Sequence, residues 1–250
     1  MNNRKLLKQG LPAALILLSA AISICGQNQP QTKRNQRPNQ DQRPNQATSA
    51  TTPISHGNST DPVKYTYEFT QPKFYVKHIV LEHDANGRGT VTFERLNEDT
   101  PVTEPIALSP AVLQRLVASW QALQFLDSQT DYQSSKQFPH LGTMRISMER
   151  GDRKRVAEFN WTNDHDAETL INEYRKAADQ AIWIFDVAIA RQNQPLNAPK
   201  LMEALESLLN RNGMSDPQQL LPLLKDLSTD EHVPLIARYH ALRLIKKIQK

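Results

Sequence analysis

The sequence predicts an α+β fold, an antiparallel sheet with the order ββαββα that is covered by two helices and followed by a helical appendage. Two stretches in which apolar and polar residues alternate are each followed by a stretch with apolar residues at helical spacing. Residues 199–250 then show helical spacing alone. Strand pairs that alternate with helices in this way are typical of a sheet with helices packed on one face.

The N-terminus has the layout of an export signal over residues 1–26. Arg4, Lys5 and Lys8 precede an apolar run that ends at Ile24 and is too short to span a bilayer as a stable helix. We therefore expect an exported protein that works in the periplasm, elsewhere in the cell envelope or outside the cell.

Cys25 is the only cysteine, and its fate has two alternatives. In a lipoprotein signal it would carry a lipid, although Ile24 stands directly before it where a small residue is usual. Cleavage after Ser23 or Gly26 fits the ordinary small-residue rule instead. In either case no disulfide forms within the chain, and a lipid on Cys25 is the only membrane attachment that we expect.

Residues 27–62 predict a disordered linker, because Asn, Gln, Pro, Thr and Ser dominate and the run QRPNQ occurs at 36–40 and again at 42–46. The chain carries a net charge of +4, and its positive excess lies in residues 1–62. Residues 63–250 hold 23 Lys and Arg against 24 Asp and Glu, a net charge of −1. We therefore expect no nucleic-acid partner.

Residues 63–192 predict the α+β domain. Its first half should hold strands over 63–70, 74–83 and 89–95. Asn86-Gly87 favours a hairpin turn between the second and third strands. Ser109-Pro110 then favours a helix start, with the hydroxyl as N-cap, and an apolar stripe predicts a helix over 110–125.

The second half repeats this arrangement. Met144 to Met148 alternates as a strand, Gly151 turns it, and a partner strand runs from Val156 to Trp161. A change of phase after Val156 predicts a bulge there. A helix over 166–191 follows, with a buried side that extends to Ile189. The core is expected to hold Val91, Phe93, Leu116, Trp120, Ile146, Phe159, Ile171, Ile182 and Phe185.

Residues 196–250 predict the helical appendage, with helices over 200–210, over 218–227 and from Asp230 to the end. The last two should pair with Leu220, Leu223, Leu224 and Leu227 facing Leu235, Ile236, Tyr239, Leu242 and Ile245. This pair resembles a single HEAT repeat, with Ala237, Ala241 and Leu242 near the positions where that family places small residues and leucine.

The sequence contains no recognisable catalytic, cofactor-binding or metal-binding motif. His78 and His83 are five residues apart on one strand and so face opposite sides of the sheet. The turn at Asp84 resembles a calcium loop, but Arg88 and Arg95 occupy positions that need oxygen ligands. We expect no enzymatic activity, no cofactor and no metal. The aromatic residues Trp120, Trp161, Trp183, Tyr174 and Phe185 are expected to be core.

The loop over 127–141 is the expected binding surface, since long loops within a compact domain are usually functional or disordered. Its candidate protein-binding residues are Tyr132, Ser134, Phe138 and His140. The alternative is an enzyme of unrecognised type, in which His140 and His165 work with Asp164 or Asp166 around the loop. Capping of a helix start also explains these two carboxylates.

Residues 65–187 resemble a family of small bacterial inhibitors of thermolysin-like metalloproteases, the emfourin type. The resemblance rests on the strand Gly89 to Arg95, on Leu108-Ser109 opening a helix that ends at Phe125-Leu126, and on a strand pair with Gly151 at its turn. It implies a domain that binds a protein and inhibits a protease. No inhibitory residue of the family maps onto this chain. The protein partner is otherwise unknown.

Overall fold

A computed structural model describes residues 61–250 of the chain. The expected export signal, Cys25 and nearly all of the expected linker lie outside the described residues. No helix within the described part is long and apolar enough to cross a membrane.

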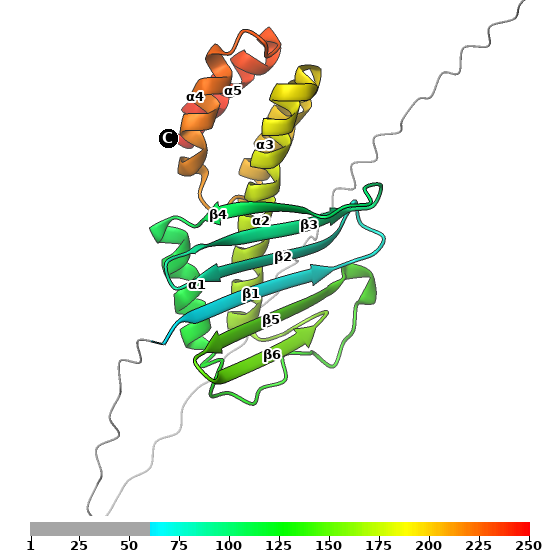
Figure 1. The fold of residues 1–250 in the computed structure, drawn as a ribbon, viewed down its shortest axis with the longest axis vertical. Coiled ribbons are helices and arrows are strands. Elements are labelled where there is room, and N and C mark those ends of the chain that lie inside the picture. Colours follow the sequence, from blue (N-terminus) through cyan, green and yellow to red (C-terminus); the bar gives the residue numbers. More distant parts are fainter. Residues whose placement is uncertain (1–60) are drawn as a thin grey trace, which may run out of the picture. The chain divides into compact units, whose positions relative to one another are not determined.

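The α+β fold class is confirmed by a six-stranded antiparallel sheet in the order β4-β3-β2-β1-β5-β6 (Figure 1). The strands are β1 (Val63–Thr70), β2 (Val76–Asp84), β3 (Arg88–Arg95), β4 (Val102–Ala107), β5 (Thr143–Arg150) and β6 (Arg153–Phe159). The central strand β1 pairs with β2 on one side and β5 on the other, so the two halves of the domain share one sheet.

Strand β4 was not expected from the sequence, and the first half of the domain therefore holds four strands. Pro105 lies in its middle, and a proline inside a strand is tolerated only at a sheet edge or a bulge. Because β4 pairs only with β3, it is such an edge.

The predicted bulge near Val156 is wrong. Strands β5 and β6 pair without interruption from Met144 opposite Phe159 to Arg150 opposite Arg153. Val156 is an apolar residue on the face away from the helices, whereas Ala157 and Phe159 point toward them, so the apparent change of phase comes from one exposed valine. Trp161 lies beyond the end of the strand. A register shift does occur in β2, between Val76 and His78.

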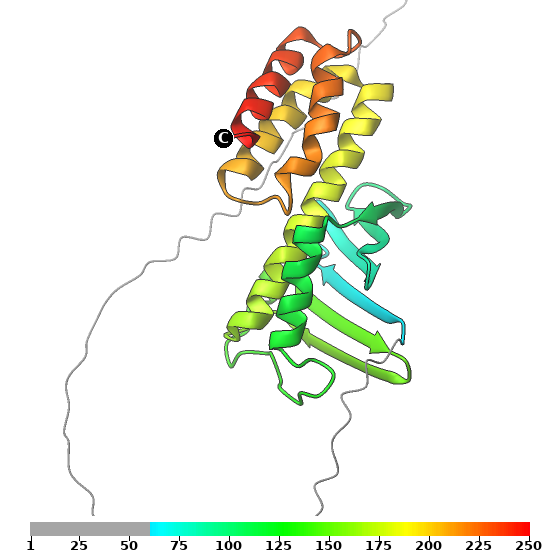
Figure 2. The same ribbon diagram turned by 90° about the vertical axis from the view of Figure 1, so that its left-hand side faces the viewer.

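Helices α1 (Pro110–Ala122) and α2 (His165–Asn193) cover one face of the sheet, and no helix of the described residues covers the other face (Figure 2). The Ser109 hydroxyl accepts a hydrogen bond from the Val112 amide at 3.3 Å, as the sequence predicts. Asp164 caps α2 by accepting the amides of Asp166 and Ala167 at 3.0 and 2.9 Å. The two helices contact each other along this face.

The main hydrophobic core lies between this helical layer and the sheet. Eight of the nine expected core residues are buried, and Phe185 is only half-buried at its edge. The expectation that Ile189 and Trp161 are buried is wrong, because their exposed fractions are 41% and 38%. Ile189 lines an open groove beside β4, which is described below.

Three polar side chains of this core are joined in a chain of hydrogen bonds. Trp120 Nε1 donates to the Tyr174 hydroxyl at 2.9 Å, and that hydroxyl lies 2.9 Å from Nε2 of His83. His83 Nδ1 lies 2.7 Å from the carbonyl of Asp84, so a neutral imidazole that donates from Nδ1 completes every pair. His83 therefore has a structural role under the helices.

The C-terminal part is helical, as expected, with α3 (Ala198–Asn210), α4 (Leu221–Thr229) and α5 (Leu235–Ile248). A second hydrophobic cluster joins them to Trp183 and Val187 of α2. Helix α5 begins at Leu235 rather than Asp230, whose carboxylate instead accepts the amide of His232.

The expected buried face of α5 is wrong at four of its five residues, and Ile245 alone is buried as expected. Leu235, Ile236, Tyr239 and Leu242 are exposed, with exposed fractions of 54%, 68%, 58% and 43%. Beside Ile245 the helix buries Ala237, His240, Ala241 and Leu244. The two alanines bring the α5 backbone close to its neighbours, which the larger side chains would not permit.

We predict that Ile146→Ala destabilises the protein by about 2–5 kcal/mol, because it leaves a cavity at a fully buried position. The matched change Ile236→Ala, on the exposed face of α5, should cost less than about 0.5 kcal/mol. Urea unfolding followed by tryptophan fluorescence measures both. Equal losses in the two variants would contradict the described core.

Candidate functional site

The loop over 127–141 lies along the β6 edge of the sheet. Arg155 of β6 donates to the Thr130 carbonyl at 2.6 Å, and the Ser134 amide donates to the Trp161 carbonyl at 2.9 Å. The chain leaves the loop through Gly142 at φ +93°, where a Cβ would stand 2.5 Å from the ring of Phe69. The loop therefore shields this sheet edge from pairing.

Two of the four candidate loop residues support the loop from within. Tyr132 is 3% exposed, and its ring lies 6.2 Å from that of Phe125 and 6.0 Å from that of Phe159. Ser134 is buried as well, and its hydroxyl accepts from Asn163 at 3.0 Å. Neither side chain is available for a partner while the loop keeps this conformation.

The other two candidates form an aromatic corner, which we define as Phe138, His140 and Trp161. The Phe138 ring meets Trp161 edge-on at 5.1 Å and His140 at 6.0 Å. His140 is exposed and Phe138 is half-exposed. Their role in binding stays a prediction, to which the structure adds Trp161, 38% exposed, a residue that the sequence assigned to the core.

The residues of the alternative enzyme hypothesis are not joined in the structure. Asp164 is committed to capping α2, while His165 and Asp166 are exposed. Within residues 61–250 no hydrogen bond or ion pair joins either His140 or His165 to the two carboxylates. The same part of the chain holds no group of three His, Cys, Asp or Glu placed to ligate a metal ion.

His78 and His83 lie on opposite faces of β2, as their spacing predicts. His78 lies on the helix-free face with Nε2 3.0 Å from Glu68 and Nδ1 3.1 Å from Glu94. Partial burial lowers the pKa of His78, but the two carboxylates outweigh it and leave this pKa above its ordinary value. Burial instead holds the pKa of His83 below its ordinary value.

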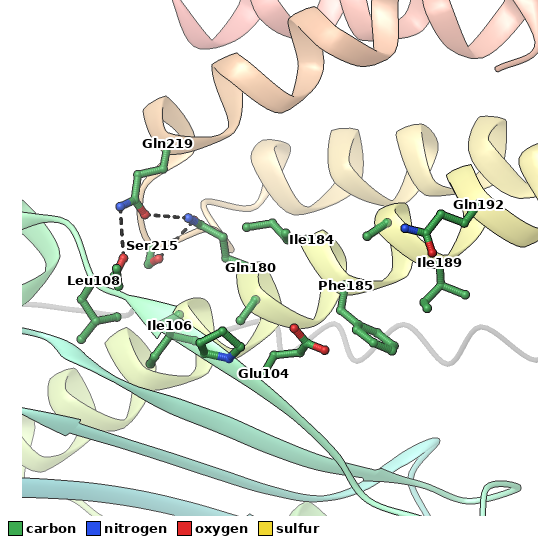
Figure 3. A pocket seen from close by; sticks show the side chains of 15 residues that line it. Glu104, Ile106, Leu108, Gln180, Ile184, Phe185, Ile189, Gln192, Ser215 and Gln219 are labelled. Atoms are coloured by element: carbon green, nitrogen blue, oxygen red, sulfur yellow. Dashed lines mark hydrogen bonds between the residues drawn. The ribbon is translucent and has the colours of Figure 1, made fainter. Parts of the chain in front are cut away.

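A half-open groove of about 370 Å³ lies between the edge strand and the long helix (Figure 3), and we call it the α2–β4 groove. Strand β4 contributes Glu104, Pro105 and Ile106 to its lining, and α2 contributes Ile184, Phe185 and Ile189. The Phe185 ring is held from behind by Phe93, whose ring it meets edge-on at 5.4 Å. The lining is mostly apolar, as in typical ligand sites.

Hydrogen bonds of the Gln180 and Gln219 side chains close one end of the groove. The buried side-chain oxygen of Gln180 accepts from the Ser215 hydroxyl at 3.1 Å and from the Asp216 amide at 2.9 Å. Its nitrogen donates to Gln219 at 3.1 Å, and Gln219 donates to the Ala107 carbonyl at 3.4 Å (Figure 3). This chain ties α2, the segment before α4 and strand β4 together.

The backbone of β4 offers hydrogen bonds to the groove side. The Leu108 amide donates to Gly87 beside β3, so alternation directs the amides and carbonyls of Thr103, Pro105 and Ala107 to the free edge. Proline has no N–H, and Gln219 already donates to the Ala107 carbonyl. At the free edge, the amide and carbonyl of Thr103, the carbonyl of Pro105 and the amide of Ala107 therefore remain available for hydrogen bonds with a ligand.

Sequence reasoning missed this groove. Its walls come from residues about 80 positions apart, and β4 itself was not expected. The exposed apolar side chains Ile184 and Ile189 of α2 were the available indication, but Ile189 was assigned to the buried side of the helix and Ile184 was not considered. Among the lining residues Glu104 is the only one with an acidic or basic side chain.

A scan against models of known protein families finds no match to the chain, and a search of curated proteins finds no relative.

The two histidines of β2 predict opposing pH effects. With a raised pKa, His78 adds stability below its ordinary pKa of 6.5, and this stability is lost as pH rises through the folded-state pKa. With a lowered pKa, His83 removes stability as pH falls below 6.5. We predict that in His78→Gln the free energy of unfolding falls more steeply than in the wild type between about pH 7 and about pH 5.

Urea unfolding across this pH range measures the effect. The matched control is His165→Gln, which changes an exposed histidine without a side-chain partner among the described residues and should follow the wild-type curve. Parallel curves for His78→Gln and the wild type would contradict the role given to Glu68 and Glu94.

Proposed function

We propose that the chain is a non-catalytic binding module of the cell envelope or exterior that takes an extended, apolar segment of a partner protein into the α2–β4 groove. The observation that carries this proposal is the lining of the groove, in which Ile184, Phe185 and Ile189 face an edge strand across a half-open space. Apolar walls with a few placed polar groups suit binding of a largely apolar ligand.

The shape of the groove favours an extended segment. Such a segment can run beside β4, exchange hydrogen bonds with Thr103 and Ala107, and direct alternate side chains toward α2. Pro105 removes one donor from this edge, so side-chain contacts with α2 must supply much of the affinity. Glu104 favours a Lys or Arg in the bound segment.

The same lining favours binding over catalysis. General acid–base chemistry needs a proton donor and acceptor within hydrogen-bond reach of the reacting group, and Glu104 stands alone in the groove. No cofactor or metal enters the proposal. The export signal expected over residues 1–26 supplies the location.

We predict that peptides selected from a random phage-displayed library on residues 27–250 share apolar residues at alternate positions and one Lys or Arg. Ile189→Glu and Ile184→Glu should each weaken the selected peptides about tenfold or more, because a carboxylate replaces an apolar contact. Isothermal titration calorimetry measures the affinities. Glu104→Gln should reduce the preference for the basic residue.

The matched control is Leu242→Glu, which places the same charge on an exposed apolar position of α5 outside the groove. It should leave peptide binding unchanged. Failure of the library to enrich any such peptide, or equal losses for the groove and control variants, would exclude the groove as the binding site.

A second candidate function is inhibition of a thermolysin-like metalloprotease, and the aromatic corner favours it. Phe138 and His140 present partly exposed rings on the loop, beside Trp161 of the segment after β6, and Arg155 and that segment anchor the loop by hydrogen bonds. Aromatic side chains on a rigid support are typical of protein-binding surfaces. The resemblance of residues 65–187 to the emfourin type supplies the class of partner.

This candidate predicts that residues 27–250 slow thermolysin at sub-micromolar concentration. The double variant Phe138→Ala/Trp161→Ala should lose the inhibition while keeping the wild-type circular dichroism spectrum, whereas Ile189→Glu should keep it. Hydrolysis of a fluorogenic peptide measures both. No inhibition of thermolysin or of several related proteases would remove this candidate and leave the groove proposal standing.

A further inference from the structure

Helix α5 exposes an apolar face that nothing in the described residues covers. Leu235, Ile236, Tyr239 and Leu242 lie on one side of the helix, and each has an exposed fraction above 40%. Single exposed apolar residues are ordinary, but four large ones in two adjoining turns form a contiguous patch. This patch, together with Arg243, Lys246 and Lys250 that follow it along the helix, is called the α5 face.

The same face becomes basic toward its C-terminal end. Residues 235–250 hold five Lys and Arg and no Asp or Glu. Helical spacing places Arg243, Lys246 and Lys250 in line with Tyr239 and Leu242. Within residues 61–250 these three basic side chains make no ion pair, whereas Lys247 is held by Asn210 and Glu206.

The rest of the folded part has the opposite charge. Residues 63–234 carry 18 Lys and Arg against 24 Asp and Glu, a net charge of −6, while residues 235–250 carry +5. An anionic surface therefore repels most of the molecule and attracts α5. This charge asymmetry selects one orientation of approach.

We propose that the α5 face docks onto an anionic lipid surface. Leu235, Ile236, Tyr239 and Leu242 would enter the boundary between headgroups and acyl chains, and Arg243, Lys246 and Lys250 would contact the lipid phosphates. An exposed apolar stripe combined with Lys and Arg, without acidic residues, is the composition of helices that lie in a membrane interface. The docking is independent of any lipid on Cys25 and of the α2–β4 groove.

A second copy of the chain fits the α5 face less well. A two-fold contact through this face would bring Arg243, Lys246 and Lys250 of one copy close to the same cations of the other, and residues 235–250 hold no acid to neutralise them. Anionic lipid headgroups neutralise the same charge. The charge of the face therefore favours lipid as the occupant.

Sedimentation of residues 27–250 with vesicles tests the proposal, because this segment contains the whole described unit and lacks Cys25. Binding to vesicles of mixed phosphatidylcholine and phosphatidylglycerol should exceed binding to phosphatidylcholine alone, and salt should weaken it. The variant Arg243→Gln/Lys246→Gln/Lys250→Gln should bind the mixed vesicles about 100-fold more weakly. Ile236→Ser/Leu242→Ser should lose about tenfold.

Matched controls remove the same groups elsewhere. Lys73→Gln/Lys136→Gln/Lys225→Gln removes three exposed cations, and Leu196→Ser removes an apolar side chain that is 83% exposed. Both should bind mixed vesicles as the wild type does. Equal binding to the two vesicle types, or equal losses in the α5 and control variants, would overturn the proposal. So would a dimer in sedimentation equilibrium that Ile236→Ser/Leu242→Ser dissolves.

Discussion

The structure depends on one helix that serves two hydrophobic cores. The neighbouring residues Ile182 and Trp183 of α2 belong to different clusters, the first beneath the sheet and the second among the C-terminal helices. Trp183 also donates its indole N–H to the Leu201 carbonyl at 2.8 Å, which fixes α3 against α2. Since both cores are built on the same continuous helix, α2 sets the position of every surface discussed above.

The α2–β4 groove exists because α2 packs into both hydrophobic cores. Where α2 passes the last strand of the sheet, one of its sides packs on the first core and another on the second. Ile184 and Ile189 lie on the side that remains, and no element within residues 61–250 covers them. The hydrogen-bonded chain from Gln180 to Gln219 connects α2 to the segment before α4 at the same point and closes one end of the groove.

The spacing of apolar residues in the sequence was sufficient to predict the elements that bury one face. Strand β1 and helix α1 bury the alternate and helically spaced residues that the sequence indicates. Strand β4 was missed because an edge strand with Pro105 buries little and shows no alternation of apolar and polar residues. On α5 the sequence reading assumed that the largest apolar side chains are buried, but close packing selected Ala237 and Ala241 instead.

The candidate sites could not be read from the sequence because spatial neighbours are distant along the chain. Glu104, Ile184 and Gln219 meet only after the sheet, α2 and the segment before α4 are in place. The loop residues carried a local signal, yet polar and aromatic composition did not separate the supporting Tyr132 from the exposed His140. Composition does separate the two apolar surfaces. The groove carries one carboxylate and the exposed charges of the α5 face are cations, so the two surfaces suit partners of opposite charge.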